Sequence, residues 1–329
     1  MPRYPAYLNL AQKDWKQRID KAYQFLGKCQ VCPRKCGVNR LKNERARPPR
    51  LPPAFELPKA SRAGRLGEVG RGFCHLGNQP MVSSFHPHFG EEACLVGQHG
   101  SGTIFFTHCN LACVYCQNYD ISQLGYGKEV SPERLTEMMI ALQKLGCHNI
   151  NLVTPTSQVP QILASLPSAI QKGLKIPLVY NSNAYDSAET LRLLDGIVDI
   201  YMPDAKYSDD KIAIKYSSAP NYFAIMKKAI GKMHRQVGDL IINQDGLAVR
   251  GLLIRHLVLP NGLAGTQKIM EFLAKEISAN TFVNIMDQYR PCWKANQYPE
   301  INRPITFEKY QEARKLAKKA GLKRLYKDY

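Results

Sequence analysis

Three cysteines lie close together in the stretch HCNLACVYCQN. They are Cys109, Cys113 and Cys116, spaced as Cys-x3-Cys-x2-Cys. Thiolates bind iron–sulfur clusters, zinc and copper, and a closed structural zinc site takes four protein ligands. Three thiols on a cluster leave one metal without a protein ligand, and an open coordination position is where a cofactor or substrate binds. The spacing therefore suits an iron–sulfur centre with one open iron, and a zinc site stays the alternative.

Four further cysteines form a second group. The stretch CQVCPRKC holds Cys29, Cys32 and Cys36, and Cys74 follows after a long insert. Clustered cysteines indicate metal binding in a chain without an export signal, because disulfides are rare in a reducing compartment. Four thiols suit zinc or another structural metal, and they also suit an auxiliary iron–sulfur cluster. A group that binds no metal is the third alternative.

Short β-rich runs alternate with helical patterns from residue 102 onward. The runs lie at 103–107, 149–153, 176–180, 198–202, 252–259 and 282–286, and the helical patterns at 131–145, 158–171, 187–195, 219–233 and 266–278. This alternation predicts parallel strands joined by crossover helices. Six such units predict an α/β fold, a partial TIM-type (β/α)6 barrel, with a doubly wound sheet as the alternative.

Polar residues follow most of the predicted strands. In α/β barrels the active site forms at the carboxyl ends of the strands, where the loops converge. The cysteines follow the first run, and the later runs lead to Thr154 and Thr156, Asn181 and Asn183, Asp204 and Lys206, and finally Gln288 and Arg290. Arg255 and His256 alternate inside the fifth run, so only one of them can face the interior. We expect His256 at the rim.

The parts outside the repeat differ in composition. Residues 1–100 hold a predicted helix over 1–28, the first cysteine group and a proline-rich basic insert at 43–66, which together predict an N-terminal cysteine-rich cap. Residues 101–293 form the predicted barrel. Residues 294–329 form a predicted C-terminal amphipathic basic helix, which extends over 306–325.

Composition and charge narrow the class of protein. The chain has 329 residues, 44% of them hydrophobic, which is enough for a sizeable core and argues against disorder. Its apolar runs are too short to span a membrane and its start lacks export features, so we expect a cytoplasmic protein without a membrane partner. The net charge of +18 is concentrated at both ends, which indicates a well-charged surface or an RNA or acidic protein partner. Cys94, Cys147 and Cys292 stand apart and are expected to be buried hydrophobes.

The string CNLACVYC resembles the Cys-x3-Cys-x-aromatic-Cys signature of the radical S-adenosylmethionine (SAM) superfamily, with Tyr115 at the aromatic position. Longer strings resemble the homologues of pyruvate formate-lyase-activating enzyme within that superfamily. They are VTPTSQVPQI, DIYMPDAKY, IRHLVLPN and MDQYRP. The resemblance covers most of residues 25–293.

The resemblance implies a reaction. Cys109, Cys113 and Cys116 would hold a [4Fe–4S] cluster whose open iron chelates SAM. Reductive cleavage of SAM would then yield a 5′-deoxyadenosyl radical that abstracts a hydrogen, with reduced flavodoxin or ferredoxin as electron donor. The implied substrate is a protein or peptide, as when a glycyl radical is installed. An RNA-modifying radical enzyme and a non-catalytic zinc-binding scaffold remain as alternatives.

The resemblance also predicts which residues bind SAM. Lys206 would meet the methionine carboxylate, because a carboxylate in a dry site favours a fixed cation. The family's Gly-Gly-Glu segment, which binds the methionine amino group, is replaced here by Thr154-Pro155-Thr156, whose hydroxyls or backbone carbonyls can accept hydrogen bonds from an ammonium. The other predicted SAM-binding residues are Tyr115 near adenine, Asn181 and Asn183 at the ribose or carboxylate, Asp204 beside Lys206, and His256.

Overall fold

The computed structural model describes residues 4–42 and 72–327. The strands of this part are β1 (Met81–His88), β2 (Ser101–Phe106), β3 (Lys128–Glu129), β4 (Ile150–Val153), β5 (Leu178–Ser182), β6 (Ile200–Pro203), β7 (Ile241–Ile242), β8 (Ala248–Leu257), β9 (Phe282–Met286) and β10 (Arg324–Leu325). The proline-rich insert predicted at 43–66 lies outside the described residues.

The helices lie mainly between the strands. They are α1 (Gln12–Gly27), α2 (Ala93–Val96), α3 (Tyr119–Ser122), α4 (Pro132–Lys144), α5 (Val159–Gln171), α6 (Ala188–Leu193), α7 (Asp210–Ser217), α8 (Tyr222–Val237), α9 (Thr266–Phe272) and α10 (Phe307–Ala320). Short 3-10 turns lie at Ala6–Asn9, Thr156–Gln158, Pro260–Gly262 and Ala295–Gln297, and a π-helical turn at Leu273–Ile277 extends α9.

Six parallel strands form the centre of one sheet, in the order β2-β4-β5-β6-β8-β9. They coincide with the six predicted runs, and the predicted crossover helices lie between them. Within the described residues the sheet runs from β10 at one edge to β3 at the other, so it is open. The α/β class and the partial barrel are therefore confirmed, and β7 adds the short hairpin partner of β8.

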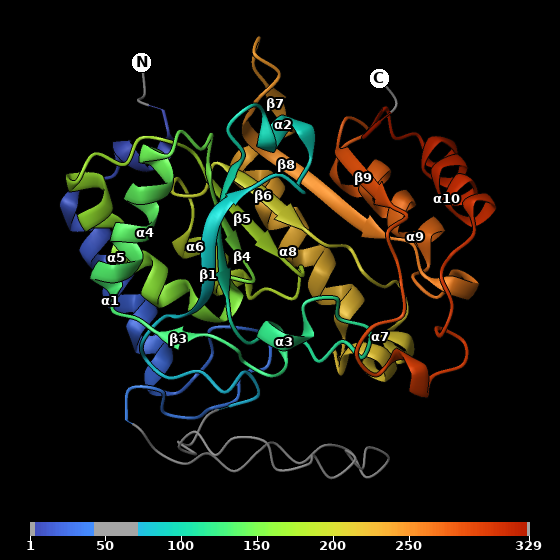
Figure 1. The fold of residues 1–329 in the computed structure, drawn as a ribbon, viewed down its shortest axis with the longest axis horizontal. Coiled ribbons are helices and arrows are strands. Elements are labelled where there is room, and N and C mark those ends of the chain that lie inside the picture. Colours follow the sequence, from blue (N-terminus) through green and yellow to red (C-terminus); the bar gives the residue numbers. More distant parts are fainter. Residues whose placement is uncertain (1–3, 43–71, 328–329) are drawn as a thin grey trace.

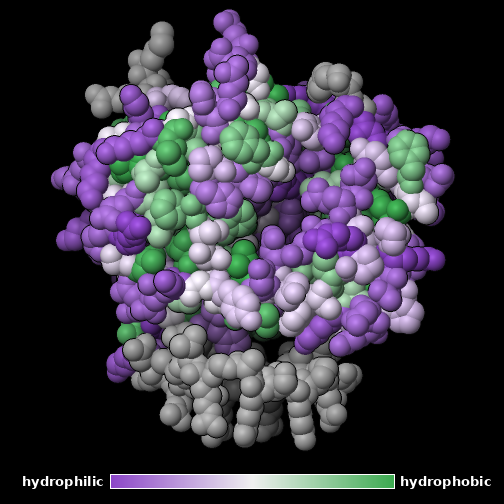
Figure 2. Space-filling model, viewed as in Figure 1, coloured by the Kyte–Doolittle hydropathy of each residue, from purple (hydrophilic) through white to green (hydrophobic). Residues whose placement is uncertain are grey.

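The arrangement leaves a hollow on one face. Figure 1 shows α1, α4 and α5 gathered on one side of the molecule and α9 and α10 on the other, with β1 in front of the sheet. The space-filling view of the same face is hollowed near its centre, and hydrophilic side chains lie in that hollow (Figure 2).

Two strands outside the predicted barrel also join the sheet. β1 pairs antiparallel with β2, and β10 pairs parallel with β9 beyond the end of α10. The predicted C-terminal helix ends early, because Gly321 adopts a φ of 101° that terminates α10 and turns the chain toward β10. None of the described helices is long and apolar enough to cross a membrane.

The helices follow from local sequence. The Ser131 hydroxyl caps α4 by accepting a hydrogen bond from the Arg134 backbone, and Pro132 occupies the first helical position, where its missing N–H costs nothing. The face that packs on the core carries buried residues at helical spacing, namely Leu135, Met138, Met139 and Leu142. By contrast, β5 is buried along its whole length, as expected for a parallel strand covered on both faces.

Candidate active site

The three-cysteine loop follows β2 and is tied to α7 through its backbone. The Ala112 N–H donates to the Ser217 carbonyl at 3.0 Å, and the Val114 N–H donates to the Tyr216 carbonyl at 2.9 Å. His108, directly before the first cysteine, adopts a φ of 62°. Such left-handed backbone is uncommon outside glycine and turns the chain sharply. Strand β2 and helix α7 therefore determine together where the thiols lie.

Cys109 is surrounded by hydrogen-bond donors from two loops. The Asn183 side-chain amide donates to its sulfur (Nδ2–Sγ 3.2 Å), and the Leu111 backbone N–H lies 3.4 Å from the same sulfur. Asn183 also donates to the Asn110 side-chain oxygen at 2.8 Å. Donors of this kind stabilise thiolate ligands and tune the reduction potential of a cluster. Asn183 therefore lies at the site, as predicted from its place after β5, but its closest partner is the cysteine.

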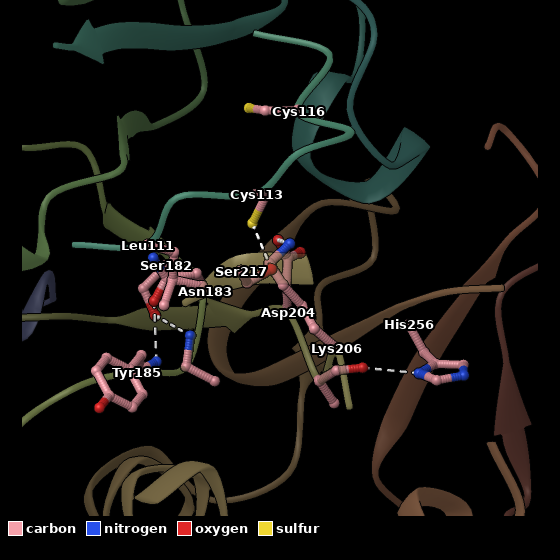
Figure 3. A network of polar contacts seen from close by, with 12 residues as sticks. Leu111, Cys113, Cys116, Ser182, Asn183, Tyr185, Asp204, Lys206, Ser217 and His256 are labelled. Atoms are coloured by element: carbon pink, nitrogen blue, oxygen red, sulfur yellow. Dashed lines mark hydrogen bonds and ion pairs between the residues drawn. The ribbon is translucent and has the colours of Figure 1, made fainter. Parts of the chain in front are cut away.

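The other two cysteines bond to hydroxyl groups. The Ser217 hydroxyl donates to the Cys113 sulfur at 2.9 Å (Figure 3), and Cys116 shares a 3.1 Å hydrogen bond with the Ser122 hydroxyl. Neither serine was predicted. A serine gives no sequence signal for this role, because Ser217 reaches the thiol only through the packing of α7 against the loop.

The environment of the thiols fits metal ligation. Burial raises the pKa of Cys109 to about 12 and that of Cys113 to about 11, and nearby Lys206 opposes the shift at Cys113. Thiols with such pKa values keep their protons at neutral pH until a metal displaces them. Among the described residues no three Cys, His, Asp or Glu side chains stand in a metal-holding arrangement as they lie. The fit rests on the donor set: three thiols from one loop, each with a hydrogen-bonding neighbour.

Lys206 is a fixed cation beside the cysteine loop. Its ammonium lies 2.6 Å from Asp204 Oδ2, and its side chain is 16% exposed. Burial opposes the charge, but the Asp204 carboxylate outweighs it and raises the pKa of Lys206 above its usual value. The ammonium therefore stays charged and acts on the nearby Cys113 thiol, and Figure 3 draws Lys206 beside Asp204 in the same group of residues.

Lys206→Met is expected to weaken SAM binding about 10- to 100-fold, because a charge-assisted hydrogen bond contributes roughly 1.5–3 kcal/mol. Equilibrium dialysis of SAM against the reconstituted protein measures this. Lys211→Met, at an exposed position of α7, is the matched control and should bind SAM normally. Equal affinity in both variants would remove Lys206 from the cofactor site.

The Thr-Pro-Thr turn after β4 is strained and has a buried acid behind it. Thr154 adopts a φ of 62°, which is costly for a β-branched residue, and its N–H donates to the Asn181 carbonyl at 2.9 Å. The Thr156 hydroxyl donates to Asp186, which Tyr180 and Ser182 also contact. Sequence analysis missed Asp186, because it lies 30 residues beyond Thr156 in the chain.

Tyr115 is buried within a chain of hydroxyl groups. Its hydroxyl bonds to that of Tyr207, which in turn bonds to Ser217 at 2.7 Å, and its ring meets Tyr289 edge-on at 5.7 Å. The chain of hydroxyls leads from Tyr115 to the Cys113 thiol. A contact of Tyr115 with adenine stays a prediction.

Gln288 and Arg290 lie exposed beyond β9.

Arg255, rather than His256, faces the barrel interior. The Arg255 guanidinium bonds Glu91 and Glu92, which enter from the segment between β1 and β2. His256 points the other way, with Nδ1 2.7 Å from the Ala205 carbonyl and Nε2 2.9 Å from the Thr266 hydroxyl (Figure 3). The alternation of the two side chains was predicted, but which of them faces the interior was not. Both ring nitrogens of His256 are occupied by Ala205 and Thr266.

The buried His256 should make stability depend on pH. Burial lowers its pKa to about 4, whereas an unfolded histidine titrates near 6.5. Its contribution is therefore complete above pH 6.5 and is lost as the pH falls toward 4, by roughly 3 kcal/mol. Urea unfolding of the metal-free protein between pH 4.5 and 7 measures this, and His256→Gln should show a flatter profile. Parallel profiles would contradict the assignment.

The N-terminal cysteines also come together. Cys29, Cys32, Cys36 and Cys74 all line one small cavity beside the cysteine loop, although Cys74 lies far from the other three in the chain. Their grouping from sequence therefore agrees with the geometry, and no metal identity follows from it.

Comparison with known proteins decides the family. The model of the Radical SAM superfamily matches residues 103–248, which span the cysteine loop and the strands up to β8. The chain is also 34% identical to the uncharacterized protein MJ0674 of Methanocaldococcus jannaschii, over 94% of this chain and 80% of that protein. The chain belongs to the radical SAM superfamily. A radical SAM protein of this kind carries a [4Fe–4S] cluster and SAM, and it uses a reductant and a substrate.

Solved structures resemble this radical SAM protein more distantly. The FeFe-hydrogenase maturase HydG from Carboxydothermus hydrogenoformans is 12% identical, with a TM-score of 0.44 over 65% of this chain and 49% of that chain. This chain thus spans about half the length of HydG. A domain of pyruvate-formate lyase-activating enzyme from Bacteroides vulgatus is 15% identical, with a TM-score of 0.34 over 59% of this chain and 89% of that domain.

Proposed function

We propose that this radical SAM enzyme cleaves SAM reductively at a [4Fe–4S] cluster and uses the 5′-deoxyadenosyl radical to abstract a hydrogen from a protein or peptide, in the manner of glycyl-radical-activating enzymes. The proposal rests mainly on the cysteine loop after β2, where each of the three thiols has a hydrogen-bonding neighbour. Cys109, Cys113 and Cys116 would hold the cluster. The cluster supplies the electron that breaks the sulfonium bond of SAM.

The chain's own residues would orient the cluster ligands and SAM and would exclude water from the site. Asn183 and Ser217 donate to the sulfurs of Cys109 and Cys113 and so hold these side chains in place. Lys206 supplies the cation for the methionine carboxylate, with Asp204 keeping it charged. Because Asn183 and Cys113 are almost fully buried, water is largely excluded around them, which protects a reactive species from side reactions.

A large substrate suits the open sheet. The described sheet does not close, and the face in Figure 2 is hollowed near its centre, so the site can admit part of a polymer. A protein or peptide agrees best with the resemblance to the activating enzymes. An RNA substrate is the second candidate, because the net charge of +18 is suited to a phosphate backbone.

The experiment is an anaerobic assay for 5′-deoxyadenosine. The reconstituted enzyme is given SAM and either reduced flavodoxin or reduced ferredoxin, with and without a desalted cell extract. Stimulation by the extract that protease destroys and RNase leaves intact supports a protein or peptide. Stimulation that only RNase destroys establishes the RNA alternative, and a colourless protein that binds zinc and releases no 5′-deoxyadenosine is a scaffold.

A further inference from the structure

Cys29, Cys32, Cys36 and Cys74 line one cavity together with buried polar side chains. Its other lining residues are Val31, Arg34, Val38, Arg40, Gly72, Phe73, Asn110 and Ser157. Position 72 needs glycine, because a Cβ there would lie 2.8 Å from Cys36 Cβ and 2.9 Å from its sulfur. The backbone that leads to Cys74 therefore packs directly against Cys36, and the Phe73 N–H lies 3.4 Å from the Cys36 sulfur.

Three of the described residues that line this cavity have a buried donor atom without a hydrogen-bond partner. Among the described residues, no hydrogen-bond partner is found for Arg34 Nη2, Arg40 Nη2 or Ser157 Oγ. Arg40 is 3% exposed and Ser157 is 4% exposed, so no bulk water compensates them. Buried polar groups are nearly always satisfied, and an unpaired buried charge is costly. Thiolate sulfurs in this cavity would give these donors an acceptor.

The charges of the lining balance if the thiols become metal ligands. Four thiolates around one divalent ion carry a net charge of two minus, and the two guanidinium groups offset it. Arg40 already lies near a ligand, with Nη1 4.0 Å from the Cys29 sulfur. Each thiol gives up its proton when it binds the ion, so binding releases protons as the ion enters.

The size of the cavity distinguishes an ion from a cluster. The cavity that the four cysteines line together with eight other residues has a volume of ≈ 10 Å³. That is about the space of one water-sized sphere. Among the described residues no group of cysteines already stands in a metal-holding arrangement, so the four sulfurs would turn toward a single ion to reach metal–sulfur bonds of about 2.3 Å. A cube of four irons and four sulfides needs far more room.

We propose that Cys29, Cys32, Cys36 and Cys74 bind one divalent ion, Zn²⁺, in tetrahedral geometry, with Arg34 and Arg40 donating to the ligand sulfurs. This site is separate from the SAM-binding cluster and does not depend on the proposed function.

The ion would also brace the catalytic loop. Arg34 Nε donates to the Asn110 carbonyl at 2.9 Å, and the Asn110 side-chain oxygen accepts from Asn183, which donates to Cys109. Figure 1 places residues 28–42, in blue, at the same end of the molecule as α3, which follows the cysteine loop. The contacts thus lead from the proposed metal site through Asn110 and Asn183 to Cys109, the first cluster ligand.

Cobalt titration tests the site directly. A full-length Cys109→Ala/Cys113→Ala/Cys116→Ala chain removes the catalytic thiols, and Co²⁺ is added anaerobically. We expect thiolate-to-cobalt absorption that saturates at about one ion per chain and disappears when Zn²⁺ is added. Adding Cys29→Ala/Cys32→Ala should abolish the signal. The matched control adds Cys94→Ala/Cys147→Ala, two cysteines outside both groups, and should keep it.

A variant that keeps all four thiols separates metal binding from folding. Arg40→Met should weaken Co²⁺ binding about 10- to 100-fold while circular dichroism stays native, because residues that bond metal ligands contribute this much to affinity. If Cys29→Ala/Cys32→Ala fails to fold, the single variant Cys36→Ala replaces it.

Three results would overturn the proposal. The first is that the folded triple variant gives no cobalt signal. The second is that the wild-type protein holds iron and sulfide at the stoichiometry of an additional cluster, and that this content depends on Cys29 and Cys32. The third is that Arg40→Met binds Co²⁺ with unchanged affinity. Loss of 5′-deoxyadenosine activity alone bears only on the function proposed above.

Discussion

Cys113→Ala is expected to abolish the formation of 5′-deoxyadenosine from SAM. Cys113 is the most buried of the three loop cysteines, it accepts a hydrogen bond from Ser217, and it lies beside the charged Lys206. Alanine removes a metal ligand that no neighbouring thiol can replace, so the cluster is lost or damaged and the reaction has no electron path. Anaerobic turnover with reductant, together with the iron content per chain, measures both effects.

Cys147→Ala is the matched control for that experiment. Cys147 is 3% exposed and belongs to the hydrophobic core after α4, so its removal tests the effect of losing a buried thiol alone. It should keep both iron and activity, at a modest cost in stability. A Cys113→Ala protein that still cleaves SAM would contradict the assignment of the cysteine loop.

Arg255→Ala is expected to lower the free energy of unfolding by about 3–5 kcal/mol, because it leaves two buried carboxylates without their cation. Arg255 Nε lies 2.8 Å from Glu92 Oε1, and Nη2 lies 2.6 Å from Glu92 Oε2 and also contacts Glu91. The three side chains are 13%, 1% and 7% exposed for Arg255, Glu92 and Glu91. Urea denaturation of the metal-free chain measures the loss.

An exposed pair provides the comparison. Arg192 lies 3.8 Å from Glu189 with 62% and 50% of the side chains exposed, so Arg192→Ala should change stability by less than about 1 kcal/mol. The double variant Arg255→Met/Glu92→Gln should recover part of the loss, since it removes one of the charges that Arg255→Ala strands. If Arg255→Ala is as stable as Arg192→Ala, the buried pair does not hold the segment between β1 and β2 in the barrel.

The periodicity of apolar residues and the spacing of the apolar runs were sufficient to predict the central strands of the barrel. The six apolar runs became the six central parallel strands because each is long enough to cross a buried sheet and is followed by an amphipathic helix. Strand β1, which lies between β2 and β3, escaped notice, since its histidines and proline obscure the alternation of buried residues. β10 is only two residues long, and its pairing with β9 depends on where α10 ends.

Local sequence determined the three thiols of the loop, because their chemistry depends on residue type and on a spacing within one short segment. It also limited the interior position of β8 to Arg255 or His256, through the two-residue period of a strand. Only the tertiary structure decided between them, because the choice depends on Glu91 and Glu92 arriving from another part of the chain. The same reason explains Ser217, Asp186 and the orphaned guanidinium of Arg40. A hydrogen bond or an ion pair forms between groups that folding brings together. The spacing of residues along the chain does not determine the distances between such groups in the folded protein.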